Sequence, residues 1–184
     1  MTRIGLISDT HHYLDETIFE HFKDMDEVWH AGDLGNIEIA DCLTSLMPIL
    51  PDQHTKDIID GQTGRHIIFR GVYGNIDGQD VRSILPEQIV FICEEVKVMM
   101  RHIGGYPPKY NPETKKELLI HKPKIFISGH SHILKIVYDD KLDCLHINPG
   151  AAGKHGWHQM RTVIRFVIDG KEIRDCEVIE LGGR

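Results

Sequence analysis

The chain has 184 residues, of which 41% are hydrophobic and 27% are charged. This length and composition are typical of one soluble globular domain that can bury a full hydrophobic core. The formal net charge of -7 argues against binding to long nucleic acids or to anionic membranes, because both require a cationic surface.

The sequence has none of the patterns typical of export or membrane insertion. The first apolar run is only about six residues long, which is too short for the core of a signal peptide. No stretch approaches the roughly 18 apolar residues that span a membrane. The cysteines lie far apart and form no Cys-x-x-Cys pair: Cys42, Cys93, Cys144 and Cys176. We therefore expect a cytoplasmic protein with reduced cysteines.

Strands and helices are expected to alternate in the first half of the chain. Short apolar runs predict buried strands over Arg3–Ser8, Asp26–His30 and His66–Tyr73. Apolar residues at helical spacing predict helices over Asp15–Phe22 and Asn36–Met47. The segment Pro48–Arg65 contains proline and glycine and lacks a clear period, so we expect a surface excursion at residues 48–65.

Strands follow one another in the second half. Apolar runs predict strands over Ile84–Ile92, Val96–His102, Lys124–Ser128, Leu134–Tyr138, Cys144–Ile147, Thr162–Ile168 and Ile173–Leu181. A helix is expected over Glu113–Lys122 after a loop at Gly104–Pro112, and Asp169-Gly170 predicts a hairpin turn. The pattern predicts an α/β (α+β) fold, in which a two-sheet β-sandwich is flanked by helices, with parallel pairing early and antiparallel pairing late.

Five short segments carry metal-ligating side chains at or just beyond the ends of these predicted strands. The segments are Asp9-Thr10-His11, Gly32-Asp33, Gly74-Asn75-Ile76-Asp77, His102 and Gly129-His130-Ser131-His132. The crevice beyond the carboxyl ends of strands is where α/β folds build sites, so the segments are expected to converge. The candidate ligands are Asp9, His11, Asp33, Asn75, His102, His130 and His132. They offer oxygen and imidazole nitrogen but no thiolate, which suits divalent manganese, iron, zinc or nickel.

Each segment alone is weak evidence for a metal site. Asp-x-His occurs by chance in a chain with 13 histidines, and Gly-Asp or Gly-Asn is common in turns. Gly-His-Ser-His after a buried strand is the strongest single motif. The joint occurrence of all five segments at strand ends indicates a site for two metal ions, of the kind that hydrolyses phosphate esters.

The five blocks, in this order, resemble those of the calcineurin-like metallophosphoesterase superfamily, which read DxH, GD, GNH[DE], H and GHxH. The opening IGLISDTH and the VWHAGD and INPGA segments look like those of the small YfcE-type phosphodiesterases, and the retromer subunit of similar size shares that fold. The resemblance covers essentially the whole chain. It implies a single four-layer domain over residues 1–184. Such a domain would hydrolyse small phosphodiesters or nucleotide-like substrates through a hydroxide shared by two divalent metal ions, with manganese the first expectation.

The resemblance also implies a role for each candidate residue. One metal would be held by Asp9, His11 and His132, and the other by Asn75, His102 and His130, with Asp33 bridging the two. Asp77 would orient a ligand and would not itself bind metal. Catalysis would depend on Asp33, Asn75, Asp77 and His102.

Two departures from the family pattern bear on catalysis. The third block usually has a histidine that donates to the leaving-group oxygen, and Ile76 occupies that position here. The small YfcE-type members often lack this histidine as well, so the change is expected to favour substrates whose leaving group needs little protonation. The fourth block often reads His-Gly-His in close relatives, whereas this chain has His102-Ile103-Gly104.

Weaker candidates and an alternative function stay open. Further residues that could contact substrate are His12, Tyr106, Lys109, Tyr110, Lys154, His155, Trp157 and His158. The segment that contains Lys154, His155, Trp157 and His158 is equally compatible with a polar loop around one packed tryptophan. The alternative function is a catalytically weak or inactive scaffold for protein–protein interaction, as the retromer relative suggests, although none of the seven ligands is replaced. A homo-oligomer is compatible with the resemblance, because β-rich relatives of this size often self-associate.

Overall fold

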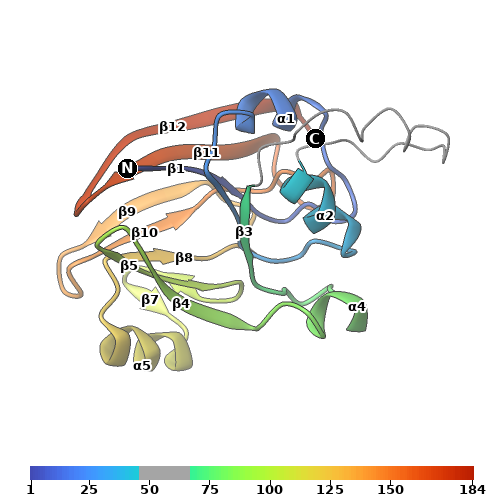
Figure 1. Ribbon diagram of the computed structural model, residues 1–184. Coiled ribbons are helices and arrows are strands. Elements are labelled where there is room, and N and C mark those ends of the chain that lie inside the picture. Colours follow the sequence, from blue (N-terminus) through green and yellow to red (C-terminus); the bar gives the residue numbers. More distant parts are fainter. Residues whose placement is uncertain (46–66) are drawn as a thin grey trace, which may run out of the picture.

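The structure, a computed structural model, describes residues 1–45 and 67–184, and two stacked β-sheets form its centre (Figure 1). The first sheet, in the order β12-β11-β1-β2-β3, contains β1 (Thr2–Ile7), β2 (Glu27–His30), β3 (Ile68–Gly71), β11 (Met160–Asp169) and β12 (Glu172–Gly183). The first three strands are parallel, and β11 and β12 are antiparallel to their neighbours. This sheet therefore follows the expected change from parallel to antiparallel pairing.

The second sheet departs from that expectation. In the order β4-β5-β8-β10-β9, it contains β4 (Gln88–Cys93), β5 (Val96–Arg101), β8 (Ile125–Ile127), β9 (Lys135–Asp139) and β10 (Cys144–Asn148). Both edge strands are antiparallel, but β8 is parallel to β5 and to β10. The expected antiparallel pairing is wrong for β8, because a helix connects it to β5 and such a crossover returns the chain in the same direction.

Helices cover the outer faces of both sheets and complete four layers (Figure 1). The helices are α1 (Thr17–Phe22), α2 (Glu38–Ser45), α4 (Gln79–Arg82) and α5 (Pro112–His121). Phe22 of α1 and Leu43 of α2 pack with Val28 on the first sheet. Leu118 of α5 packs with Phe126 on the second sheet. The predicted two-sheet sandwich with flanking helices is therefore confirmed.

Side chains that alternate between the two faces of a strand divide the core into layers. Leu6 points between the sheets and packs with Trp29, Ile127 and Phe166, whereas its neighbour Ile7 points to the helices. Successive strand residues face opposite sides of a sheet, so a continuous apolar run marks a strand that is buried on both faces. Full burial of one such side chain contributes about 1.5 to 3 kcal/mol to the stability of the folded state.

Several short features were not predicted by periodicity. The expected loop at Gly104–Pro112 contains a small hairpin of β6 (Gly105–Tyr106) and β7 (Lys109–Tyr110), and α4 lies in a stretch with no predicted element. Elements of two to four residues are too short to show a period.

The expected excursion at 48–65 lies outside the described residues. Within the described ranges, no helix is both long enough and apolar enough to cross a membrane.

His146 of β10 is a fully buried side chain whose ionisation is expected to weaken the fold in acid. Its Nε2 lies 3.0 Å from Ser128 Oγ, and burial lowers its pKa to about 4. In the unfolded chain the ring takes up a proton at its ordinary pKa of about 6.5, so the unfolded state binds more protons between these two values. The contribution of His146 is therefore complete above about pH 6.5 and should fall by roughly 2 to 3 kcal/mol as the pH drops to about 4.

Urea unfolding of the metal-free protein at a series of pH values measures this loss. The variant His146→Gln keeps a side-chain hydrogen-bonding group but cannot ionise, so its free energy of unfolding should change less over the same pH range. Equal pH dependence in the two proteins would contradict the prediction.

Candidate metal centre

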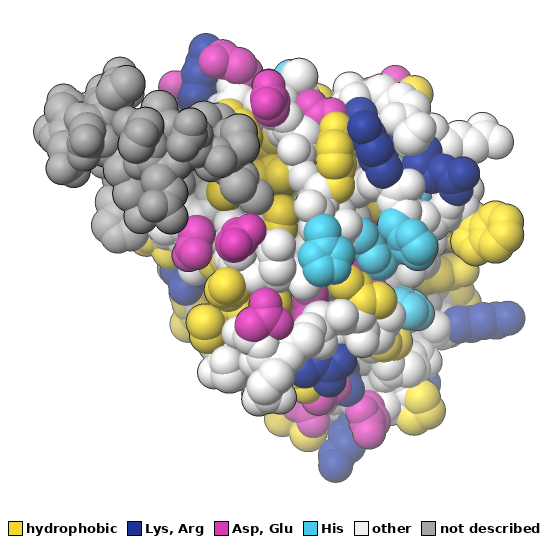
Figure 2. All heavy atoms as spheres, turned by 90° about the vertical axis from the view of Figure 1, so that its right-hand side faces the viewer, with side chains coloured by type: hydrophobic (Ala, Val, Ile, Leu, Met, Phe, Trp, Pro, Cys, Tyr) yellow, Lys and Arg dark blue, Asp and Glu magenta, His cyan; other side chains and the backbone are white. Residues whose placement is uncertain are grey.

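The five predicted segments meet at one end of the sandwich, where parallel strands of both sheets end. The strand ends supply Asp9 and His11 after β1, Asp33 after β2, Asn75 after β3, His102 after β5, and His130 and His132 after β8. Figure 2 shows histidine side chains gathered on the face of the molecule at this end. The carboxyl ends of parallel strands thus bring together side chains that lie far apart in the sequence.

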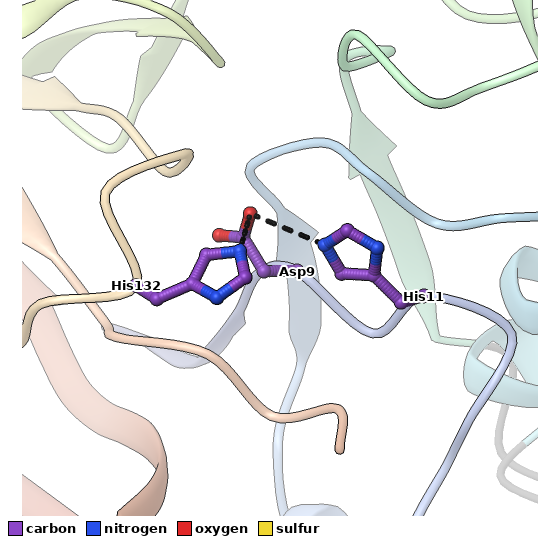
Figure 3. A group of neighbouring side chains, drawn as sticks. All are labelled: Asp9, His11 and His132. Carbon is purple, nitrogen blue, oxygen red and sulfur yellow. Dashed lines mark ion pairs between the residues drawn. The ribbon is translucent and has the colours of Figure 1, made fainter. Parts of the chain in front are cut away.

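The first group consists of Asp9, His11 and His132, which point toward one another (Figure 3). Oδ1 of Asp9 lies 3.1 Å from Nε2 of His132 and 3.9 Å from Nε2 of His11. Oδ2 accepts hydrogen bonds from Ser8 Oγ at 2.6 Å and from the His130 amide at 3.1 Å. These bonds fix the fully buried carboxylate so that Oδ1 faces the two imidazoles.

The second group consists of Asp33, His102 and His130, whose ligand atoms lie within 4.8 Å of one another. Oδ2 of Asp33 lies 3.2 Å from Nε2 of His102 and also 3.6 Å from Nε2 of His11 in the first group. Oδ1 accepts a hydrogen bond from the Ile76 amide at 3.0 Å. Asp33 therefore lies between the two groups, with one oxygen directed at both.

The donor atoms of these groups fit divalent cations. His102 donates its Nδ1 hydrogen to the carbonyl oxygen of Ala31 at 2.7 Å, which leaves the Nε2 lone pair directed at Asp33. Nε2 of His102 and Nε2 of His11 are both buried without a well-aligned hydrogen bond. Buried polar atoms without partners are costly, and a cation between them and the carboxylates would satisfy both.

Asp33 and His102 of the second group shift each other's pKa. Burial opposes a charge on His102, but the carboxylates of Asp33 and Asp9 outweigh it and raise the pKa of this ring. Burial alone would raise the pKa of Asp33, but the contact with His102 outweighs it and lowers that pKa. Burial lowers the pKa of His11 and of His130. A proton and a metal ion therefore compete for Nε2 of His102.

Most of the candidate ligands have a left-handed backbone conformation. Positive φ angles occur at Asp9 (54°), His11 (47°), Asp33 (57°), His130 (67°) and His132 (57°). This conformation costs of order 1 to 3 kcal/mol for a residue other than glycine and persists where surrounding contacts enforce it. Here the amides of Asp9 and His11 donate to the carbonyls of Gly32 and Asp33, each at 3.0 Å. The loops after β1 and β2 therefore hold each other in the conformation that directs the ligands inward.

The loop after β3 is fixed by Asp77 and Arg82. The carboxylate of Asp77 accepts hydrogen bonds from the amides of Gly35 and Gly74, each at 2.7 Å. Arg82 donates to the carbonyl oxygens of three loop residues, Gly74, Asn75 and Asp77. The exposed side chain of Asn75 lines a cavity of about 300 Å³ together with His102. The orienting role of Asp77 and the assignment of Asn75 as a ligand both stay predictions.

His30 belongs to the site although it was not among the predicted residues. It is fully buried at the end of β2, with Nε2 3.0 Å from Thr10 Oγ1 and Nδ1 accepting from the Gly32 amide at 3.1 Å. Burial lowers its pKa to about 4, so the ring is neutral near pH 7. Through its contacts with Thr10 and Gly32, His30 joins the loops after β1 and β2. The VWHAGD segment contains His30, but only these contacts distinguish it from an ordinary core histidine.

The weaker candidates in the loop after β5 do not join the site. Tyr106 and Lys109 pair in the β6–β7 hairpin, and Tyr110 packs on the ring of Phe126. None of these three lines the cavity beside the metal groups. His12 is exposed next to the first group.

The loop at residues 153–158 does approach the site. The rings of His155 and His158 lie beside those of His11 and His132, with centroid separations of 5.0 Å and 5.3 Å respectively. The side chain of Trp157 is 98% exposed. The interpretation of this segment as a loop around a packed tryptophan is therefore wrong.

Gly74 is the glycine whose replacement should most directly displace a candidate ligand. A Cβ at this position would lie 2.0 Å from Oδ1 of Asp33 and 2.4 Å from its backbone nitrogen. We expect Gly74→Ala to shift Asp33, to weaken metal binding, and to lower the rate of any phosphoester hydrolysis at this site by roughly tenfold or more, since misplacement by about 1 Å can cost 10²-fold. Metal content and hydrolysis rate measure this effect.

A matched control is available in the same loop. In Gly78→Ala the new Cβ would approach only the flexible carboxylate of Asp80, at 2.8 Å, so metal content and rate should stay near those of the wild type. Full activity and full metal content in Gly74→Ala would contradict the proposed position of Asp33.

The sequence matches known metallophosphoesterases over most of its length. Residues 2–171 match the family model described as the calcineurin-like phosphoesterase superfamily domain. The curated protein named "Probable metallophosphoesterase" from Methanothermobacter thermautotrophicus is 27% identical over an alignment that covers 97% of this chain and 92% of that protein.

Solved structures share the fold. An archaeal phosphodiesterase superposes with a TM-score of 0.66 and 21% identity, covering 97% of this chain and 99% of that one. A single mutant of Vps29 from Entamoeba histolytica superposes with a TM-score of 0.68 and 17% identity, covering 98% of this chain and 99% of that one. Because the family match extends over most of its length, the chain belongs to the calcineurin-like phosphoesterase superfamily.

Proposed function

We propose that this chain is a metal-dependent phosphodiesterase that hydrolyses small phosphate esters at a centre for two divalent ions. The observation that carries the proposal is the position of Asp33, whose Oδ2 lies 3.2 Å from His102 and 3.6 Å from His11. A carboxylate that faces both groups can hold two ions at the separation of about 3.5 to 4 Å used in two-metal hydrolysis. The archaeal phosphodiesterase with the same fold supports the diester class.

The protein would hold the ions and the substrate in position, and the ions would supply positive charge. Bound ions lower the pKa of water and neutralise negative charge on the phosphoryl oxygens. The bond from His102 to Ala31 fixes the tautomer that offers Nε2 to the centre. The bonds from Ser8 and the His130 amide orient the carboxylate of Asp9 so that Oδ1 faces the imidazoles.

The rim next to Asn75 limits which leaving groups can depart. Ile76 and Ile103 expose 40% and 42% of their surface there, and neither can donate a proton. A leaving group with a high pKa needs such a donor, whereas one with a low pKa departs as an anion. We therefore propose that esters with acidic leaving groups, such as phenolates, are the better substrates.

A comparison of two p-nitrophenyl esters tests the proposal. Purified protein loaded with Mn²⁺ should hydrolyse bis(p-nitrophenyl) phosphate faster than the monoester p-nitrophenyl phosphate. The variant His130→Ala, which loses a ligand of the second group, should lose most of this activity.

The same experiment addresses the scaffold alternative. If the wild type with metal present is as inert as His130→Ala toward both esters, the phosphodiesterase proposal fails and a binding role is favoured. The Vps29 structures show that the fold is shared, and they carry no argument about activity.

A further inference from the structure

The loop at residues 153–158, which we call the platform loop, presents an exposed aromatic ring beside the candidate metal centre. Trp157 is 98% exposed, whereas the other tryptophan, Trp29, is fully buried. Tryptophan is a highly buried residue type on average, and its ring is frequently used for recognition where it is exposed. The exposed ring is therefore available for stacking with a ligand.

Contacts to the metal centre fix the platform loop. The Gly153 amide donates to the carbonyl oxygen of Asp9 at 3.0 Å, and Nε2 of His158 lies 3.0 Å from the carbonyl oxygen of Gly153. Gly156 lies against the ring of His132, where an added Cβ would be 2.1 Å from Nδ1. Trp157 follows Gly156 directly, so its backbone is held next to the first metal group while its ring stays free.

The surroundings of the ring are cationic. Five residues line a hollow of about 500 Å³: Lys154, His155, Gly156, Trp157 and Arg184. None of these described lining residues is acidic, although the whole chain has a net charge of -7. Figure 2 shows Lys and Arg side chains above and beside the histidines on this face. The hollow therefore suits a ligand that carries negative charge.

We propose that the platform loop makes this enzyme selective for nucleotide esters. The base would stack on Trp157, and the scissile phosphate would lie over the metal groups. Lys154, whose Nζ lies 4.3 Å over the ring of Tyr13, and Arg184, which donates to the carbonyl oxygen of Gly156, would supply positive charge to further phosphate oxygens. A nucleotide joins a planar ring to phosphate anions, so it uses both features of the hollow. Stacking on an aromatic ring tolerates any base, so selectivity is expected for nucleotides as a class. This inference rests on the proposed phosphodiesterase function and names its substrate class.

Two diesters that release the same leaving group test the inference. Thymidine 5′-(p-nitrophenyl phosphate) and methyl p-nitrophenyl phosphate both give p-nitrophenolate, so only the nucleoside differs. Trp157→Ala should raise the KM for the thymidine ester, relative to that for the methyl ester, by roughly 5- to 150-fold. Trp157→Phe should retain most of the preference. A matched control is Tyr138→Ala, which removes a 52% exposed ring on β9 and should leave the ratio unchanged.

Binding without turnover gives an independent measurement. Adenosine monophosphate should quench the fluorescence of Trp157 in the metal-loaded protein, and the quenching should be lost in Trp157→Phe because Trp29 is buried. If the wild type hydrolyses the methyl ester but shows no quenching and no change of KM ratio in Trp157→Ala, the inference fails and the phosphodiesterase function stands. If both esters are inert but quenching occurs, the nucleotide site stands and the phosphodiesterase function fails.

Discussion

Asparagine in place of Asp33 is expected to lower kcat/KM for bis(p-nitrophenyl) phosphate on the order of 10³-fold. The reason lies in the two oxygens of the carboxylate. Oδ1 accepts from the Ile76 amide, and an asparagine would keep that bond. Its amide nitrogen, which has no available lone pair, would then occupy the position of Oδ2 between His102 and His11. The variant would remove a negative charge and offer a donor where a metal ligand is required.

Hydrolysis rates and metal analysis of purified Asp33→Asn measure this change, and circular dichroism shows whether the fold is kept. Asp24→Asn is a suitable control, because Asp24 is exposed in the turn before β2, whereas Asp33 follows the opposite end of that strand. Activity in Asp33→Asn within tenfold of the wild type would rule out a shared role for this carboxylate.

Removal of metal is expected to abolish activity and to lower thermal stability together. Ligands that bind only the folded state stabilise it by about 2.7 kcal/mol at a hundred times their Kd, so two ions would contribute about 5 kcal/mol. For a chain of this size that corresponds to a rise in Tm of roughly 10 °C or more. Dialysis against a chelator, followed by titration with Mn²⁺, should restore activity and Tm in parallel.

The number of metal ions bound by single-ligand variants distinguishes the two groups. His132→Ala and His130→Ala each remove a ligand from a different group, so each variant should retain one tightly bound ion where the wild type retains two.

The affinity for metal should also decrease as the pH is lowered, because the raised pKa of His102 means that a proton competes with the metal. Activity and Tm that do not respond to chelator or to Mn²⁺ would contradict the two-ion proposal.

The positions of the candidate ligands could be predicted because the strands that carry them are easily recognised. Buried strands such as β1 and β8 are continuous apolar runs, and Asp9 or His130 follows directly after the run ends. Parallel strands in one sheet end at the same edge, so side chains that follow β1, β2 and β3 in the first sheet, or β5 and β8 in the second, lie near one another. The helix predicted over Glu113–Lys122 connects β5 to β8 and already implies their parallel pairing, although antiparallel pairing was expected there.

The supporting contacts could not be predicted, since they depend on tertiary structure. Arg82 lies in a four-residue helix without a periodic pattern, and its role appears only when three carbonyl oxygens of the loop after β3 point at it. His30 resembles a core histidine until Thr10 is placed opposite its ring. The composition around Trp157 was compatible with either a packed or an exposed ring, because burial depends on segments elsewhere in the chain.

The two candidate metal groups have a consequence for the mechanical integrity of the sandwich. Asp9, His11 and Asp33 follow strands of the first sheet, whereas His102, His130 and His132 follow strands of the second. Each group therefore draws on both sheets, and an ion bound in either one would act as a cross-link between them. In the loaded protein the sheets should separate as one cooperative unit. The metal-free chain lacks this cross-link and keeps its two sheets together by apolar packing and by hydrogen bonds such as that from His102 to Ala31.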